Sequence, residues 1–195
     1  MERFQEYLDE AVRFHGHLCA GQVLGVRMSI MGMREIGIND PEAERKKMMV
    51  FVEIDRCATD AIMTVTGCKP GKRTMKIKDY GKMAATFINL ETGKAVRIAS
   101  RSSSREKSAE YVQDPGDESS IQCKAYMVMP DDELFEVKKV KVNLTPGDMP
   151  GRPVRRVTCD MCGESVMDAR DILVNNKALC RPCAEKSNYY TLGSA

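Results

Sequence analysis

Four cysteines near the end of the chain constrain its fold more than any other sequence feature. Cys159 and Cys162 form one C-x2-C pair, and Cys180 and Cys183 form a second pair after the segment 163–179. Each two-residue gap allows a tight turn to aim two sulfurs at one ion, and the intervening segment is long enough for a returning hairpin. Four thiolates without histidine favour Zn²⁺, and a closed ligand shell leaves no position for substrate. The spacing therefore predicts a structural zinc site.

The segment 156–195 around these cysteines is too short to be held by a hydrophobic core alone. Metal binding, worth about 10–16 kcal/mol in comparable sites, is expected to supply its folding free energy. Gly163 suits the turn after the first pair, and residues 180–186 favour a helix at the second. We interpret the segment as a treble-clef zinc finger with four cysteine ligands. Free thiols, two disulfides or an iron site are the alternatives.

A stretch rich in proline and glycine, TPGDMPGRP at 145–153, precedes the finger. Such composition is typical of a linker between domains. We therefore predict a core domain over 1–145, a linker over 146–155 and a finger domain over 156–195.

The periodicity of apolar residues in the core predicts an α+β fold, with flanking helices on a mixed or antiparallel sheet. In the first helix, for example, Phe4, Leu8 and Ala11 fall on one face. The predicted helices cover 2–14, 20–35, 58–67, 102–113 and 117–128, and the predicted strands cover 48–54, 74–78, 83–90, 94–99 and 134–142.

The net charge of +2 on 195 residues gives no reason to expect binding to nucleic acid or to an anionic membrane. The N-terminal residues are patterned as a helix rather than as a signal peptide, and no apolar run reaches the ~18 residues of a membrane span. We expect a cytoplasmic protein. In that reducing compartment the eight cysteines are more suited to metal binding or thiol chemistry than to disulfides.

Both histidines of the chain lie in FHGHLCAGQ, residues 14–22. Gly16 permits a turn that lets His15 and His17 converge, and Cys19 falls at the start of the next helix, where unpaired N–H groups favour a thiolate. Cys57 follows a buried strand in the same kind of position. We interpret Cys19 and Cys57 as candidate catalytic residues and, with the histidines, as candidate ligands of a core metal. The alternative is that both histidines are ordinary helix-end residues.

Cys68 is also a candidate for the core site, but its spacing argues against sharing an ion with Cys57. A helix over 57–67 would place these two cysteines about 16 Å apart. Cys68 then serves another site, or only one of the two serves any. Cys123 has no neighbouring ligand in sequence and is interpreted as a buried small hydrophobe. Lys69 and Lys72 offer positive charge for an anion.

Two long motifs carry a resemblance to a known family. FHGHLCAGQVLGVR at 14–27 and EIDRCATDAIMTVTGCKPGKRTMKIKDYGKMAATF at 53–87 resemble the FmdE-type proteins, a family that takes its name from a component of formylmethanofuran dehydrogenase. The family pattern HGHxCxG corresponds to His15, Gly16, His17, Cys19 and Gly21. The pattern DxCxxDAxxxxTGC corresponds to Asp55, Cys57, Asp60, Ala61, Thr66, Gly67 and Cys68. Members often have Pro before the glycine at the position of Ala20.

The resemblance implies an α+β core, a homodimer and association with the molybdenum or tungsten enzyme that reduces carbon dioxide onto methanofuran in methane-producing organisms. The leading hypothesis is a metal-binding accessory or redox-related subunit of such a larger enzyme. In it, His17, Cys19 and Cys57 bind zinc, nickel or iron, His15 orients a ligand and Asp60 accepts a hydrogen bond behind it.

A second hypothesis is a non-enzymatic module on a dimeric core, whose zinc finger binds nucleic acid or a partner protein. The three arginines Arg152, Arg155 and Arg156 just before the finger motivate it. The sequence does not decide whether the core catalyses any reaction.

Overall fold

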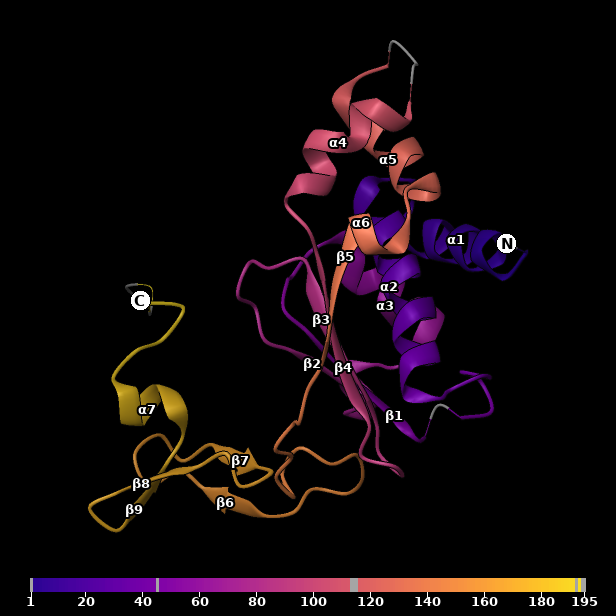
Figure 1. Ribbon diagram of the computed structural model, residues 1–195. Coiled ribbons are helices and arrows are strands. Elements are labelled where there is room, and N and C mark those ends of the chain that lie inside the picture. The colour runs from indigo at the N-terminus through magenta and orange to yellow at the C-terminus, as the bar shows by residue number, and fades with distance from the viewer. Residues whose placement is uncertain (1, 45, 113–115, 192, 194–195) are drawn as a thin grey trace. The chain divides into compact units, whose positions relative to one another are not determined.

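A computed structural model describes residues 2–44, 46–112, 116–191 and 193 of the chain. The chain divides into two compact units, Met1–Val142 and Asn143–Ala195 (Figure 1). The first unit contains a sheet with helices, and the second contains short hairpins and one short helix. Each unit is described by itself below.

The core unit is built on a five-stranded mixed sheet in the order β2-β1-β3-β4-β5. β2 runs parallel to β1, and the other neighbouring strands pair antiparallel. The strands are β1 (Met48–Val52), β2 (Met75–Ile77), β3 (Ala84–Asn89), β4 (Ala95–Ser100) and β5 (Phe135–Lys139). The predicted α+β class with a mixed sheet is therefore confirmed.

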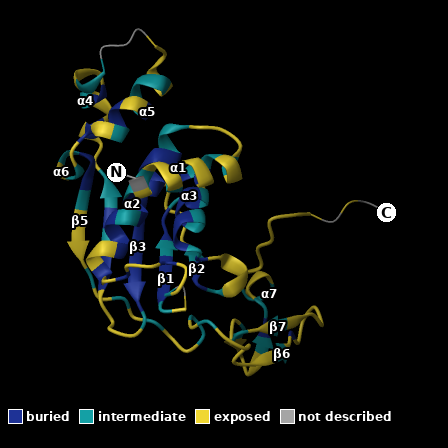
Figure 2. Cartoon of the chain, turned by 90° about the vertical axis from the view of Figure 1, so that its right-hand side faces the viewer, coloured by how far each residue is buried: buried dark blue, intermediate teal, exposed yellow. Residues whose placement is uncertain are grey.

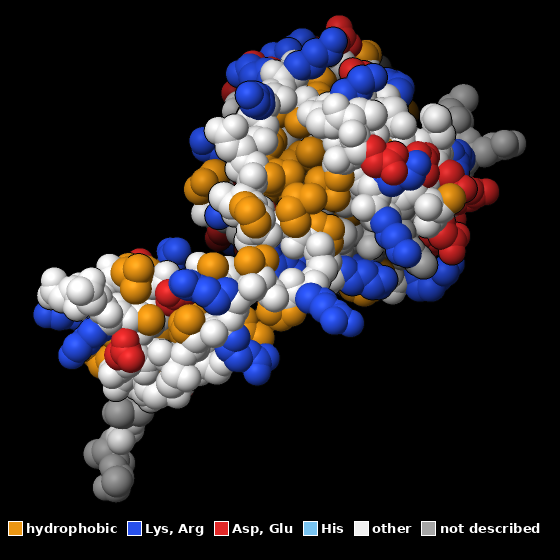
Figure 3. Space-filling model, turned by 90° about the horizontal axis from the view of Figure 1, so that it is seen from below, with side chains coloured by type: hydrophobic (Ala, Val, Ile, Leu, Met, Phe, Trp, Pro, Cys, Tyr) orange, Lys and Arg blue, Asp and Glu red, His pale blue; other side chains and the backbone are white. Residues whose placement is uncertain are grey.

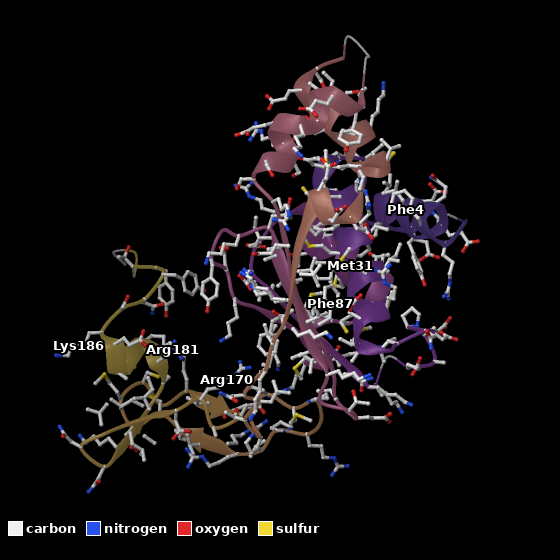
Figure 4. All side chains as sticks on the ribbon, in the orientation of Figure 1. Phe4, Met31, Phe87, Arg170, Arg181 and Lys186 are labelled. Atoms are coloured by element: carbon white, nitrogen blue, oxygen red, sulfur yellow. The ribbon has the colours of Figure 1, made fainter. Side chains whose placement is uncertain are left out.

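The register of the sheet places buried apolar side chains from three neighbouring strands on one face. Val50 of β1 pairs with Phe87 of β3, and Phe87 pairs with Val96 of β4. Directly paired residues point to the same face, and these three are buried. Phe87 and Met31 of the adjoining helix, both labelled in Figure 4, belong to the same buried hydrophobic cluster. This face of the sheet forms one side of the hydrophobic core.

Three helices cover that face: α1 (Glu2–His15), α2 (Ala20–Ile36) and α3 (Cys57–Thr66). α2 packs on β3 and β4, while α1 and α3 pack on α2 and on each other. Glycines permit the close approach, since a Cβ on Gly32 would lie 2.4 Å from the ring of Phe87. A Cβ on Gly25 would lie 2.7 Å from Cβ of Ala61 in α3. Because α2 lacks side chains at these points, it fits between the sheet and α3.

The rest of the core unit consists of the 3₁₀ turn η1 (Pro70–Lys72) and the helices α4 (Ser103–Tyr111), α5 (Glu118–Val128) and α6 (Asp131–Leu134). α5 packs on α4 and on α2. Arg27 of α2 donates through Nη1 to the carbonyl oxygens of Tyr126 and Met129 at 2.7 and 2.6 Å, and through Nη2 to Asp131. This one side chain ties the end of α5 and the start of α6 to α2.

Most element boundaries differ from the predicted ones by a few residues. The largest difference is in the strand predicted over 134–142, which ends at Lys139 and starts at Phe135. Leu134 belongs to α6 because its N–H donates to the carbonyl of Pro130, and a helix of four residues has too little periodicity to be detected. Residue 113, at the end of the predicted helix 102–113, lies outside the described residues.

The second unit contains two antiparallel hairpins, one of β6 (Arg156–Thr158) and β7 (Ser165–Met167), the other of β8 (Ile172–Val174) and β9 (Lys177–Leu179). α7 (Arg181–Glu185) follows at the second cysteine pair. The residues of the second unit are mostly exposed, whereas the strands of the core unit are largely buried (Figure 2). A unit with so little buried surface needs another source of stability. The treble-clef class itself stays a prediction.

Candidate metal centres

The four cysteines of the finger converge on one point. One sulfur from each of Cys159, Cys162, Cys180 and Cys183 lies within 4.8 Å of all the others. The sulfurs of Cys162 and Cys180 are 3.8 Å apart. Zinc–sulfur bonds of about 2.3 Å in a tetrahedron require sulfurs about 3.8 Å apart. The cluster therefore fits a structural Zn²⁺ ion, as the spacing of the cysteines predicts.

Backbone N–H groups around this cluster stabilise an ionised thiol. The backbone N–H groups of Cys162 and Cys180 lower the pKa of the Cys159 thiol to about 6. The neighbouring thiol of Cys180 raises the pKa of Cys183 to about 12. Thiolates this close together repel one another, so a divalent cation is needed before all four can ionise.

A second group of candidate ligands lies in the core unit, at the connection between α1 and α2. One ligand atom from each of His15, His17 and Cys19 lies within 4.8 Å of the other two. Gly16 ends α1 by donating its N–H to Val12 at 2.7 Å, and its φ of +98° turns the chain. Cys19 is the N-cap of α2. The turn at Gly16 thus brings both histidines next to the start of α2.

His15 is oriented by a carboxylate from α3. Its Nδ1 lies 2.8 Å from Oδ2 of Asp60. With an ionised Asp60 as acceptor, Nδ1 carries the proton and Nε2 presents a lone pair. Nε2 is buried and has no hydrogen-bond partner. A carboxylate behind an imidazole with its other nitrogen free is the usual arrangement of a metal-binding histidine. This geometry makes His15 a candidate ligand.

Cys57, the first residue of α3, lies beside Cys19 but is not one of the three clustered ligands. A Cβ on Gly21 would lie 2.9 Å from Cβ of Cys57 and 3.8 Å from Sγ of Cys19. Burial, and after it a hydrogen bond with Cys19, raises the pKa of the Cys57 thiol. The two helix starts therefore bring both candidate cysteines together, as the sequence predicted, with Cys57 adjacent to the ligand group.

Cys68 lies away from this site, which corrects its assignment as a candidate core ligand. It follows α3 at the end opposite to Cys57, is fully buried, and its Sγ donates to the carbonyl of Met48 at 3.7 Å. Burial raises the pKa of its thiol to about 11. The length of α3 separates the two cysteines, so Cys68 packs against β1 as a small hydrophobe.

Two residues near the site were not recognised from sequence. Gln22 is fully buried, and its Nε2 donates to the carbonyl of Cys57 at 2.6 Å. A glutamine three residues after Cys19, in the mostly apolar first half of the helix, was the available signal. Cys123 of α5 is buried where α5 packs on α2, and burial, followed by the charge of Cys19, raises the pKa of its thiol. Nothing in the sequence around Cys123 indicates this packing, since only the tertiary structure brings α5 to α2.

The predicted anion site at Lys69 and Lys72 has a mixed environment. Both lysines line an open cavity of about 680 Å³ beside α1. Glu6 and Glu10 of α1 line the same cavity. The acidic side chains offset the lysines, so the cavity does not select for an anion.

One face of the molecule shows no concentration of charge of one sign. On the face shown in Figure 3, Lys and Arg side chains are scattered over both units, and hydrophobic side chains gather in the middle of the core unit. No helix in the described part of the chain is long and apolar enough to cross a bilayer.

The fold and the four-cysteine cluster define an α+β protein with a C-terminal metal-binding zinc finger. Residues 14–136 match the family described as FmdE, molybdenum formylmethanofuran dehydrogenase operon, and the chain belongs to this family. Residues 152–189 match the prokaryotic dksA/traR C4-type zinc finger.

The chain is also similar to two individual proteins. The crystal structure of a tungsten formylmethanofuran dehydrogenase FmdE-like protein from Syntrophus aciditrophicus is similar with a TM-score of 0.60 and 21% identity. The similarity covers 96% of this chain and 95% of that one, and supports the fold. A probable S-adenosyl-L-methionine-binding protein from Archaeoglobus fulgidus is 34% identical over 90 residues. That match spans 45% of this chain but only 25% of the relative.

Proposed function

We propose that the core unit binds a transition metal through His15, His17 and Cys19, with Cys57 beside it. The observation that carries the proposal is the buried Nε2 of His15, which has no partner while Nδ1 is paired with Asp60. A buried acceptor without a donor costs about 1–3 kcal/mol, and a metal ion would offset that cost. Two imidazoles and a thiolate suit zinc, nickel or iron.

Three protein ligands leave a coordination position open, which is typical of reactive rather than structural sites. Cys57 lies beside Cys19, one of the three proposed ligands, and so next to the proposed metal. The proposal therefore keeps Cys57 as the candidate reactive group and Cys19 as a metal ligand. The finger zinc, with four thiolates of its own, has a structural role.

We infer further that the protein is a homodimeric accessory or redox-related subunit linked to formylmethanofuran dehydrogenase. The family description and the two motifs support this link. Light scattering of the purified protein tests the dimer. Affinity purification from cells that express the dehydrogenase tests the association.

Metal analysis of the full-length protein tests the core site. We expect two equivalents of zinc or cobalt per chain in the wild type. His15→Ala should retain one equivalent, held by the finger, and Cys159→Ser should retain the core equivalent. Cys68→Ala is the matched control, because it removes a thiol that lies away from both clusters, and should retain two. A wild type that holds only one equivalent under every loading condition would refute the core site.

The alternative function, nucleic-acid binding by the finger, has less physical support. Arg155 pairs with Asp171, and Arg181, labelled in Figure 4, lies 3.8 Å from Glu185, so acidic side chains offset two of the finger's cations. Binding to phosphates needs cations on one continuous surface. This function would be supported if the full-length protein bound DNA or RNA at low salt and lost that binding at higher salt.

A further inference from the structure

Gln22 is placed between the two helix starts that carry the core thiols. It lies three residues after Cys19 on α2, and its Nε2 donates to the backbone carbonyl of Cys57 at 2.6 Å. Its amide group is therefore held against the first turn of α3. Because Oε1 shares a rigid planar amide with Nε2, it must lie in the same space beside Cys57.

The oxygen of this amide has no partner. Gln22 is fully buried, and Oε1 is one of the buried side-chain atoms without a hydrogen bond. An amide flip would not help, because it would set Oε1 against the carbonyl oxygen of Cys57. An unpaired buried carbonyl costs about 1–3 kcal/mol, so such groups in native proteins normally meet a donor. Nε2 of His15 is likewise buried and without a hydrogen-bond partner.

We propose that Oε1 of Gln22 is a positioning group that accepts a hydrogen bond from a small protic ligand, such as water, in the core site. The inference rests on the proposed metal site, since it assigns Gln22 to the ligand that takes the open coordination position. His15 faces the metal with a lone pair, and Gln22 faces the ligand with an acceptor. The site then selects ligands that carry an O–H, N–H or S–H group over ligands that carry none.

The experiment uses full-length protein loaded with Co²⁺ as the probe. The spectrum of the His15→Ala protein, which retains only the finger metal, is subtracted to isolate the core signal. The pH midpoint of the remaining spectral change is compared among the wild type, Gln22→Met and Gln22→Glu. Ser29→Ala is the control, because Ser29 is buried on the same helix and its hydroxyl donates within that helix, to the carbonyl of Gly25.

An amide oxygen stabilises the protonated form of a ligand, so its removal in Gln22→Met should lower the midpoint by up to about one pH unit. A carboxylate in Gln22→Glu should raise the midpoint by at least as much, and Ser29→Ala should leave it unchanged. Wild-type midpoints in both Gln22 variants would overturn the inference. Loss of the second metal in both variants would also overturn it, because Gln22 would then only hold Cys57 in place. The metal count of the wild type is a separate measurement. If it shows no second metal, the proposed function itself is refuted.

Discussion

The contact between α2 and α3 allows a quantitative test of the packing that assembles the core site. In Gly25→Ala, the new Cβ would lie 2.6 Å from the carbonyl oxygen of Ala58 and 2.7 Å from Cβ of Ala61. Ordinary carbon–carbon contacts are about 3.5–4.0 Å, so the helices must separate by about 1 Å. Overpacking costs about 1–3 kcal/mol, and contact with backbone on a rigid helix favours the upper end.

Alanine also favours the helix over glycine by about 1 kcal/mol, which reduces the net destabilisation of Gly25→Ala to about 2 kcal/mol. For a chain of this length we expect the melting temperature to fall by about 4–8 °C. Urea and thermal unfolding followed by circular dichroism measure the change. Gly71→Ala is the matched control, because a Cβ there meets nothing within 4 Å. Its free energy of unfolding should lie within about 0.5 kcal/mol of the wild-type value.

A Gly25→Ala protein as stable as the wild type would refute the argument that close helix contact requires glycine at this position. A greater stability would refute it more strongly, since helix propensity would then outweigh the clash. A loss of stability in Gly71→Ala as large as in Gly25→Ala would show that the destabilisation does not come from the clash with α3, because a Cβ at Gly71 meets nothing and should slightly reduce the entropy of the unfolded chain.

Three further changes test other contacts. Hydrogen bonds from Arg97 hold the pKa of Glu53 below its usual value, so this pair stabilises the fold above about pH 4.5 and loses its effect as pH falls through the lower folded pKa. Arg97→Met should lose this pH dependence and lower the free energy of unfolding by about 3 kcal/mol at neutral pH, measured by urea unfolding. Chelation, or Cys180→Ser, should unfold the finger and leave residues 1–142 resistant to protease. Arg27→Met should free the end of α5, seen as faster hydrogen exchange over 118–128.

Each of these predictions has a result that contradicts it. An Arg97→Met protein with the acid unfolding profile of the wild type would show that Glu53 is not stabilised by this pair. Protease cleavage of the core at the same rate as the finger after chelation would show that the two units do not fold independently. Unchanged exchange in α5 of Arg27→Met would mean that packing on α2 alone holds that helix.

Local chemistry in the sequence was enough to predict several features. The two C-x2-C pairs predict the zinc finger, because the ligands of a structural zinc come in short turns that sequence spacing reveals. The apolar periodicities predict the α+β class and most helices and strands of the core. The turn at Gly16 and the helix start at Cys19 are local too, so the convergence of His15, His17 and Cys19 followed from consecutive residues.

Only the tertiary structure decided which distant residues complete the site. Asp60 reaches His15, and Gln22 reaches Cys57, because glycines in α2 let α3 pack closely against it. The separation of Cys68 from Cys57 along α3 was expected from the sequence, but its burial against Met48 of β1 was not. The free nitrogen of His15 and the free oxygen of Gln22 also depend on burial. Burial is set by long-range packing, and residue spacing along the chain does not encode it directly.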